Sequence, residues 1–115
     1  MKPERPIPRT ATERQAKAAE IRIIVLNVLQ FYQDQYAAVK IVPPGARWRE
    51  LHFSFQRHAK DAYWKITADE LWDMLYHFIR AGVVKEYHTV FKPRYVIDRE
   101  ALNAYDKRWV FSKIT

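Results

Sequence analysis

The 115-residue chain is predicted to form one α+β domain that is mainly α-helical. Three observations support this prediction. Residues 12–35 contain neither Gly nor Pro, and their apolar side chains recur at helical spacing. The segment 67–82 begins with a helix capping box and ends at a glycine. Two short runs rich in β-branched residues follow it, which is typical of a β-hairpin.

The first eleven residues are expected to form a flexible basic arm, because the opening MKPERPIPRT contains three prolines and little apolar surface. A single domain is expected over residues 12–115. Its first helix should run from about Thr12 to Gln35. The apolar face of this helix is wide, since Ile23, Leu26 and Leu29 add to the main stripe. Such a face fits a central core helix, which is the favoured interpretation, or a helix that also packs on a second copy of the chain.

The run AVKIVPPG (38–45) predicts a short β-type segment that ends at two prolines and a glycine. The next segment, RWRELHFSFQRHAKDAYWK (47–65), fits two patterns. Trp48, Leu51 and Phe55 recur at helical spacing, whereas Leu51, Phe53 and Phe55 alternate as in a strand. A helix is preferred, because the polar residues on both sides of the aromatic run contain no strand or turn signals.

The start of the third helix is predicted from Thr67 and Glu70, whose side chains form a capping box. Its core stripe contains Leu71, Met74, Leu75, Phe78 and Ile79. Gly82 is expected in the left-handed conformation that closes a helix. The runs VVKEY (83–87) and RYVID (94–98) then predict a hairpin with a loose tip. Asp98 is expected to cap a last helix from Arg99 to about Trp109.

This order of elements resembles the winged helix-turn-helix DNA-binding domain superfamily. The run LWDMLYHFIRAGVVKEY, followed by RYVID, is similar to the third helix and the wing of that family, and the resemblance covers about Ile21 to Asp98. It implies a three-helix core plus a β-hairpin wing, to which this chain adds a C-terminal helix. The superfamily includes transcription regulators, replication proteins, plasmid and phage control proteins, and winged helices that bind only proteins.

In the family, the third helix enters the major groove and the wing contacts an adjacent groove or the backbone. In this chain the corresponding groove-facing positions would be Glu70, Asp73, Tyr76, His77 and Arg80. However, residues 67–82 contain three acidic and one basic side chain, whereas residues 40–66 contain six basic and two acidic ones. Acids in the first two turns suit the helix dipole but repel phosphates. We therefore expect backbone contacts from the second helix and the wing tip. The candidate DNA-binding residues are Arg47, Arg49, Arg57, His58, Lys60, Lys65, Tyr76, His77, Arg80, Lys92 and Arg94.

The net charge of +7 and the pI near 9.8 favour a polyanionic partner. We expect a small basic protein that binds double-stranded DNA, either a transcriptional regulator or a replication, plasmid or phage accessory factor. The alternative is a winged-helix protein-interaction module, in which the acidic third helix docks on a basic partner. A homodimer through the first helix, or through this helix and the final helix that contains Trp109, is a further prediction.

Other chemistries find little support in the sequence. The absence of cysteine excludes disulfides and thiolate zinc sites, and none of the four histidines belongs to an i, i+4 metal-binding pair. We therefore expect no enzyme activity, no metal and no cofactor. Trp48 and Trp72 are expected to pack in the core, whereas Tyr63 and Trp64 fit either packing or a partner surface. The longest apolar run is too short to span a membrane, so the expected location is the cytoplasm or the nucleoid.

Overall fold

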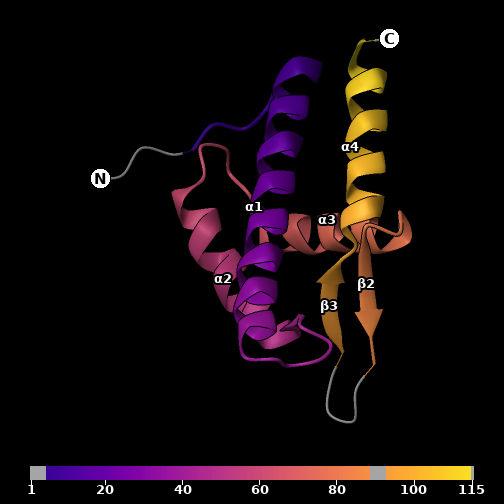
Figure 1. Cartoon of the computed structure of the whole chain (residues 1–115). Coiled ribbons are helices and arrows are strands. Elements are labelled where there is room, and N and C mark those ends of the chain that lie inside the picture. Colours follow the sequence, from indigo (N-terminus) through magenta and orange to yellow (C-terminus); the bar gives the residue numbers. More distant parts are fainter. Residues whose placement is uncertain (1–4, 89–92, 115) are drawn as a thin grey trace.

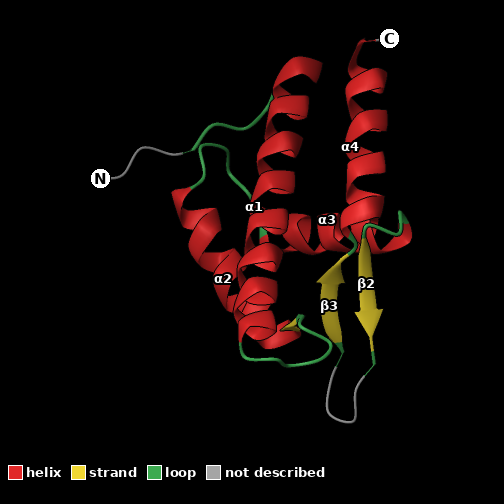
Figure 2. Ribbon diagram, viewed as in Figure 1, coloured by secondary structure: helices red, strands yellow, loops and turns green. Residues whose placement is uncertain are grey.

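The computed structural model describes residues 5–88 and 93–114, with side chains described as far as Asp106 in the last helix. Within these residues the chain forms four α-helices and a three-stranded antiparallel sheet, which confirms the prediction of a mainly α, α+β domain (Figures 1 and 2). The elements in chain order are α1 (Ala11–Ala38), β1 (Ala46–Arg47), α2 (Trp48–Asp61), α3 (Ala68–Arg80), β2 (Val84–Tyr87), β3 (Arg94–Ile97) and α4 (Arg99–Ile114).

Helix α1 passes across the molecule, with α2 on one side, the hairpin and α4 on the other, and α3 behind (Figure 1). It begins at Thr10, whose hydroxyl accepts a hydrogen bond from the Glu13 amide at 3.1 Å. The core lies where α1, α2, α3 and the sheet meet. Leu29 is buried in it and Leu26 packs against it, whereas Ile23 is 55% exposed. Most of the wide apolar face of α1 is therefore explained by the core, and a homodimer through α1 stays a prediction.

The predicted strand within residues 38–45 is wrong. Helix α1 continues to Ala38, and the strand β1 comes later, where Ala46 and Arg47 pair with β3. Gly45 explains this position. A Cβ atom at Gly45 would lie 2.5 Å from the backbone oxygen of Tyr95, so only glycine allows the chain to approach β3 so closely. The sheet order is β1-β3-β2, and Val84 pairs with Ile97 in the hairpin.

The choice of a helix for α2 and the predicted start and end of α3 are confirmed. Leu51 and Phe55 are both buried while Phe53 is exposed, which is the burial pattern of a helix and not of a strand. At the start of α3 the capping box is present, with the Thr67 hydroxyl accepting from the Glu70 amide at 3.2 Å. Gly82 follows α3 with a φ of +79°.

Helix α4 starts as predicted but extends further. The Asp98 carboxylate accepts a hydrogen bond from the Ala101 amide at 3.0 Å, and the helix continues past Trp109 to Ile114. Helices α1 and α4 run antiparallel (Figure 1), and an ion pair between Arg22 and Asp106 joins them.

The N-terminal arm contacts the end of α2 where it is described. The Pro6 carbonyl accepts a hydrogen bond from the Lys65 amide at 3.2 Å, and the Arg5 guanidinium donates to the Ala59 carbonyl. The arm therefore lies beside the loop that follows α2, and its predicted flexibility stays a prediction.

Candidate nucleic-acid interface

Helix α2 is anchored at its start by Glu50, whose carboxylate accepts a hydrogen bond from the Arg47 amide at 2.9 Å. Leu51 and Phe55 face the core from this helix. At 3.6 residues per turn, the opposite side of α2 forms a stripe about 100° wide. We call this stripe the α2 outer face; its exposed members are Arg49, Phe53, Gln56, Arg57 and Lys60.

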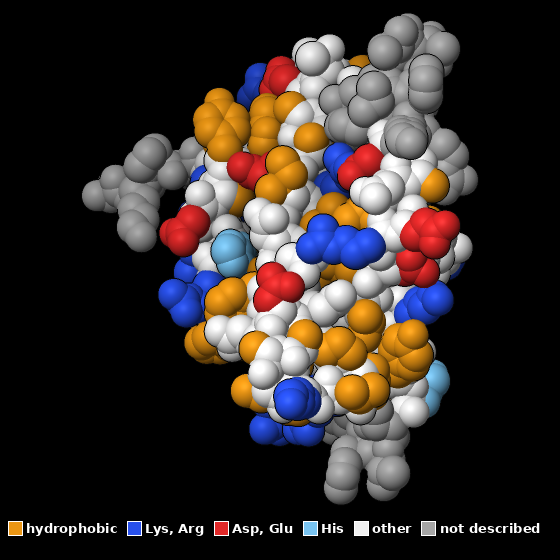
Figure 3. Space-filling model, in the orientation of Figure 1, with side chains coloured by type: hydrophobic (Ala, Val, Ile, Leu, Met, Phe, Trp, Pro, Cys, Tyr) orange, Lys and Arg blue, Asp and Glu red, His pale blue; other side chains and the backbone are white. Residues whose placement is uncertain are grey.

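The α2 outer face has unpaired positive charge. In the described part of the chain no ion pair involves Arg49, Arg57 or Lys60, nor the exposed Arg47 and Lys65 at the two ends of the helix. By contrast, Lys17 pairs with Glu70 at 2.7 Å and Lys85 pairs with Asp98 at 3.3 Å. The α2 cations are therefore available to an external anion. In Figure 3, Lys and Arg side chains gather at the edge that α2 occupies, while the front face mixes both charges with hydrophobic groups.

Helix α3 has a different surface. Asp69, Asp73, Tyr76, His77 and Arg80 are exposed on it, so its outward side is acidic and aromatic. Glu70 does not face outward with them, because it bonds to Thr67 and to Lys17 of α1. Partial burial alone would raise the pKa of Glu70, but the hydrogen bonds from Lys17 and from the Thr67 amide lower it below its usual value.

His77 contacts a neighbouring helix. Its Nε2 lies 3.0 Å from the Tyr105 hydroxyl of α4, and the two rings are in edge contact. Of the predicted groove-facing stripe, Glu70 and His77 are therefore engaged by α1 and α4. Asp73, Tyr76 and Arg80 remain on the open side of α3.

The prediction that Arg94 contacts phosphates from the wing tip is wrong. Arg94 is the first residue of β3 and points inward, where it is buried. Its Nη1 donates to the Gly45 carbonyl at 3.0 Å, and its guanidinium lies 5.1 Å from the centre of the Tyr36 ring. The other predicted wing-tip cation, Lys92, lies outside the described residues.

Tyr95 follows Arg94 in β3, is buried, and pairs with Glu86 of β2. Burial, followed by the nearby carboxylate of Glu86 and then Tyr76, raises the pKa of Tyr95 to about 12. The phenol is therefore neutral at physiological pH.

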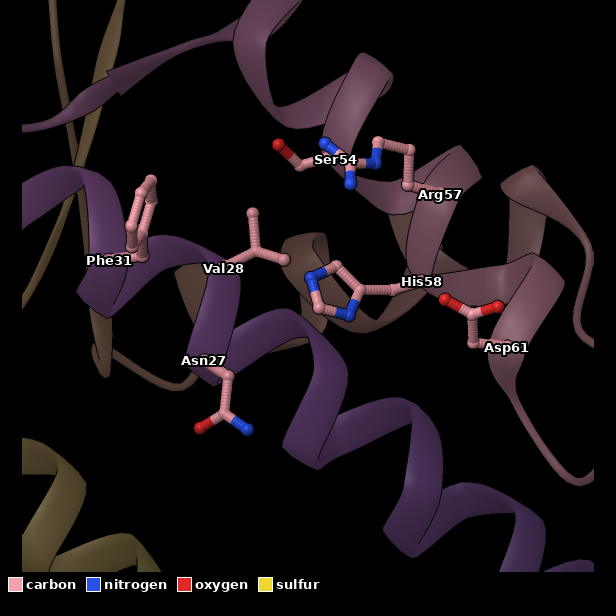
Figure 4. A pocket seen from close by; sticks show the side chains of 7 residues that line it. All are labelled: Asn27, Val28, Phe31, Ser54, Arg57, His58 and Asp61. Carbon is pink, nitrogen blue, oxygen red and sulfur yellow. The ribbon is translucent and has the colours of Figure 1, made fainter.

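His58 is exposed, but it lines a cavity between α1 and α2 and is not part of the α2 outer face. Figure 4 shows its ring pointing toward Val28 of α1. The cavity has a volume of about 360 Å³, and a second one of about 420 Å³ shares His58 and Asp61 with it. Arg57 borders the first cavity and the α2 outer face. The lining residues of the first cavity are Asn27, Val28, Phe31, Ser54, Arg57, His58 and Asp61.

The burial of the aromatic side chains differs in part from the prediction. Trp64 is buried, Tyr63 is exposed, and Trp72 is half-buried. Trp48 was expected in the core but is 43% exposed, because it stands at the very first position of α2. It packs on Trp72 of α3. The sequence contains a signal for this contact, since Trp48 with His52, and Trp72 with Tyr76, are both i, i+4 pairs that place aromatic rings on one side of each helix.

The chain matches no protein-family model, and comparisons with curated proteins and with solved structures also found no match. Among the described residues no helix is long and apolar enough to cross a membrane.

Proposed function

We propose that the protein is a small DNA-binding protein of the winged-helix class, acting as a transcriptional regulator or as a replication, plasmid or phage accessory factor. It contacts the phosphate backbone of duplex DNA through the α2 outer face, with Arg47 and Lys65 at its ends. The single observation that supports this proposal most is the row of exposed cations on α2 that form no ion pair within the described residues.

Phosphate binding by this row is driven by counterion release. Each cation that neutralises a phosphate releases a counterion from the DNA, so affinity falls steeply as salt rises. Contacts of this kind position a protein on DNA without reading its sequence. The acidic side chains of α3 would be repelled by phosphates, which disfavours insertion of α3 into a DNA groove. Asp69 and Asp73 can nevertheless accept hydrogen bonds from the amino group of cytosine.

A second candidate function is supported by α3. Asp69 and Asp73 are exposed one turn apart, beside the exposed ring of Tyr76. An acidic and aromatic surface of this kind fits a basic protein partner. In this case the protein is an interaction module that binds through α3.

Fluorescence anisotropy with a labelled mixed-sequence duplex tests the proposal. We expect binding that weakens from low to moderate salt. The triple variant Arg49→Ala/Arg57→Ala/Lys60→Ala should bind more weakly, and the slope of log affinity against log salt should fall by about 0.9 for each lost contact.

The control variant is Arg14→Ala/Lys40→Ala/Arg99→Ala, which removes the same charge from exposed positions outside α2. It should retain most of the affinity and the slope. Equal losses in the two triple variants would mean that only net charge matters. No binding to the duplex even at low salt would contradict the proposal and favour the protein-interaction module.

A further inference from the structure

Three aromatic rings form a stack where the start of α2 meets α3. The ring centroid of Trp48 lies 5.1 Å from that of His52 and 4.8 Å from that of Trp72, with interplanar angles of 6° and 9°. His52 and Trp72 are themselves nearly parallel, and their centroids are 6.3 Å apart. All three rings therefore lie in parallel planes.

The distances show which side of Trp48 is covered. Carbon atoms in contact are separated by at least about 3.5 Å, so two rings on opposite faces of Trp48 would be about 7 Å apart or more. The 6.3 Å between His52 and Trp72 is shorter than this limit. Both rings therefore lie on the same face of Trp48. The opposite indole face is covered by neither ring, and the residue as a whole is 43% exposed.

The stack rests on the core, which holds Trp48 in place. The edge of Trp72 contacts Phe55, with centroids 5.3 Å apart, and Phe55 is buried. The ring centroid of Tyr76, one turn further along α3, lies 6.4 Å from that of Trp72, and Tyr76 is 41% exposed, which extends the aromatic surface along α3. A ligand that binds to Trp48 therefore meets a ring whose orientation is already set, and little side-chain entropy is lost on binding.

The charges around the stack indicate the chemical class of that ligand. Arg47 and Arg49 flank Trp48 in the chain, and both are exposed without an ion pair in the described structure. On α3, Asp73 is the next residue after Trp72 in the chain and is also exposed. A flat ring with an attached phosphate and amino groups satisfies all three features, because the base stacks on the indole, the arginines bind the phosphate and the carboxylate accepts from the amino group.

We infer that the outer face of Trp48 is a stacking site for an unpaired nucleobase. The inference rests on the proposed function and adds a substrate class to it: DNA in which a base has left the duplex, as at a bulge, a fork or a frayed end. A base inside a continuous duplex offers only its edges in the grooves, so its face cannot reach the indole. The protein therefore binds DNA with an unpaired base more tightly than fully paired DNA.

The test compares two duplexes of equal length, one fully paired and one with a single unpaired 2-aminopurine, a fluorescent adenine analogue. Wild-type protein should bind the second about tenfold more tightly, which corresponds to about 1.4 kcal/mol and lies within the usual range for stacking on one aromatic ring. Binding should also quench the 2-aminopurine fluorescence.

Variants test whether Trp48 causes the binding preference and the fluorescence quenching. Trp48→Ala should lose the preference and the quenching while its affinity for the paired duplex stays unchanged, and Trp48→Phe should recover part of both. The matched control is Tyr87→Ala, which removes an aromatic ring that is also 43% exposed but lies on β2, outside the α2 outer face, and it should retain the preference. Circular dichroism confirms that each variant is folded.

The outcomes separate this inference from the proposed function. If wild-type protein binds both duplexes equally, or if Trp48→Ala keeps the preference, the stacking site is wrong while DNA binding stands. If neither duplex is bound, both fail. If an arginine-rich peptide binds in a Trp48-dependent manner and the bulged duplex does not, the surface is a protein-binding site and the inference is overturned.

Discussion

At the scale of single residues, Arg94 and Arg49 show that a cation's role depends on the side of the element that it occupies. Both were expected to contact DNA. Arg94 points inward from β3 and bonds to the Gly45 carbonyl, whereas Arg49 is exposed on the α2 outer face. The first should therefore stabilise the fold, and the second is available for binding.

Replacement of Arg94 by Ala should lower the free energy of unfolding by about 1.5–3 kcal/mol, because a hydrogen bond from a charged donor is lost and a buried carbonyl loses its partner. Urea denaturation followed by circular dichroism measures this. Arg49→Ala is the control and should change the stability by less than about 0.5 kcal/mol. An Arg94→Ala variant that is as stable as wild type but no longer binds DNA would show that Arg94 is a contact residue.

Glu70 should make stability depend on pH. Its folded-state pKa is lowered, so its ionised form stabilises the fold above its ordinary pKa, and this contribution is lost as pH falls through the folded-state value. Glu70→Gln should therefore be less stable than wild type at pH 7, by about 0.5–1 kcal/mol. The difference should shrink below about pH 4.

Denaturant titrations between pH 7 and pH 3 measure this difference. Asp73→Asn serves as the control, since Asp73 is exposed and is not part of the capping box. A difference between Glu70→Gln and wild type that stays constant over the whole pH range would contradict the assignment.

At the scale of elements, the local chemistry of helix ends was predictable, but contacts between distant segments were not. The capping box at Thr67 and the glycine at position 82 act within one turn of chain, so the sequence alone identifies them. The place of β1 depends on Gly45 meeting the backbone of Tyr95, some fifty residues later, and no local pattern contains that contact.

In the candidate site, too, local features were predictable from the sequence and long-range contacts were not. The basic character of α2 is visible in the sequence, and the choice of a helix over a strand also sets which of its cations face outward. By contrast, helical periodicity places Trp48 with the core residues Leu51 and Phe55 but does not show that the helix begins at that residue, where the ring reaches the surface. The burial of Arg94 was missed because the groups that cover it, the Gly45 carbonyl and the Tyr36 ring, come from segments far away in the sequence, and no local pattern contains those contacts.

At the scale of the whole molecule, one face of α1 keeps apolar side chains in contact with solvent. Ile23 is 55% and Phe31 is 56% exposed, and both border the cavities between α1 and α2. Exposed apolar surface of this kind marks interaction sites. It agrees with the prediction of a homodimer, in which the same surface of two copies would meet.

Sedimentation equilibrium at micromolar concentration should therefore show a dimer for the wild type and a monomer for Ile23→Glu, because a charge buried at the interface has no partner. Phe53→Glu places the same charge at an equally exposed apolar residue on α2 and should remain dimeric. A monomeric wild-type protein would contradict the prediction of a homodimer.

The central claim is that DNA contacts the α2 side of the molecule rather than the outward side of α3. Two-dimensional ¹⁵N NMR of the full chain, titrated with a mixed-sequence duplex, tests it most directly. The largest changes in amide signals should fall between Arg47 and Lys65, with smaller changes at Asp69, Asp73 and Arg80. Changes centred on α3 with α2 unaffected, or no changes at all, would contradict it.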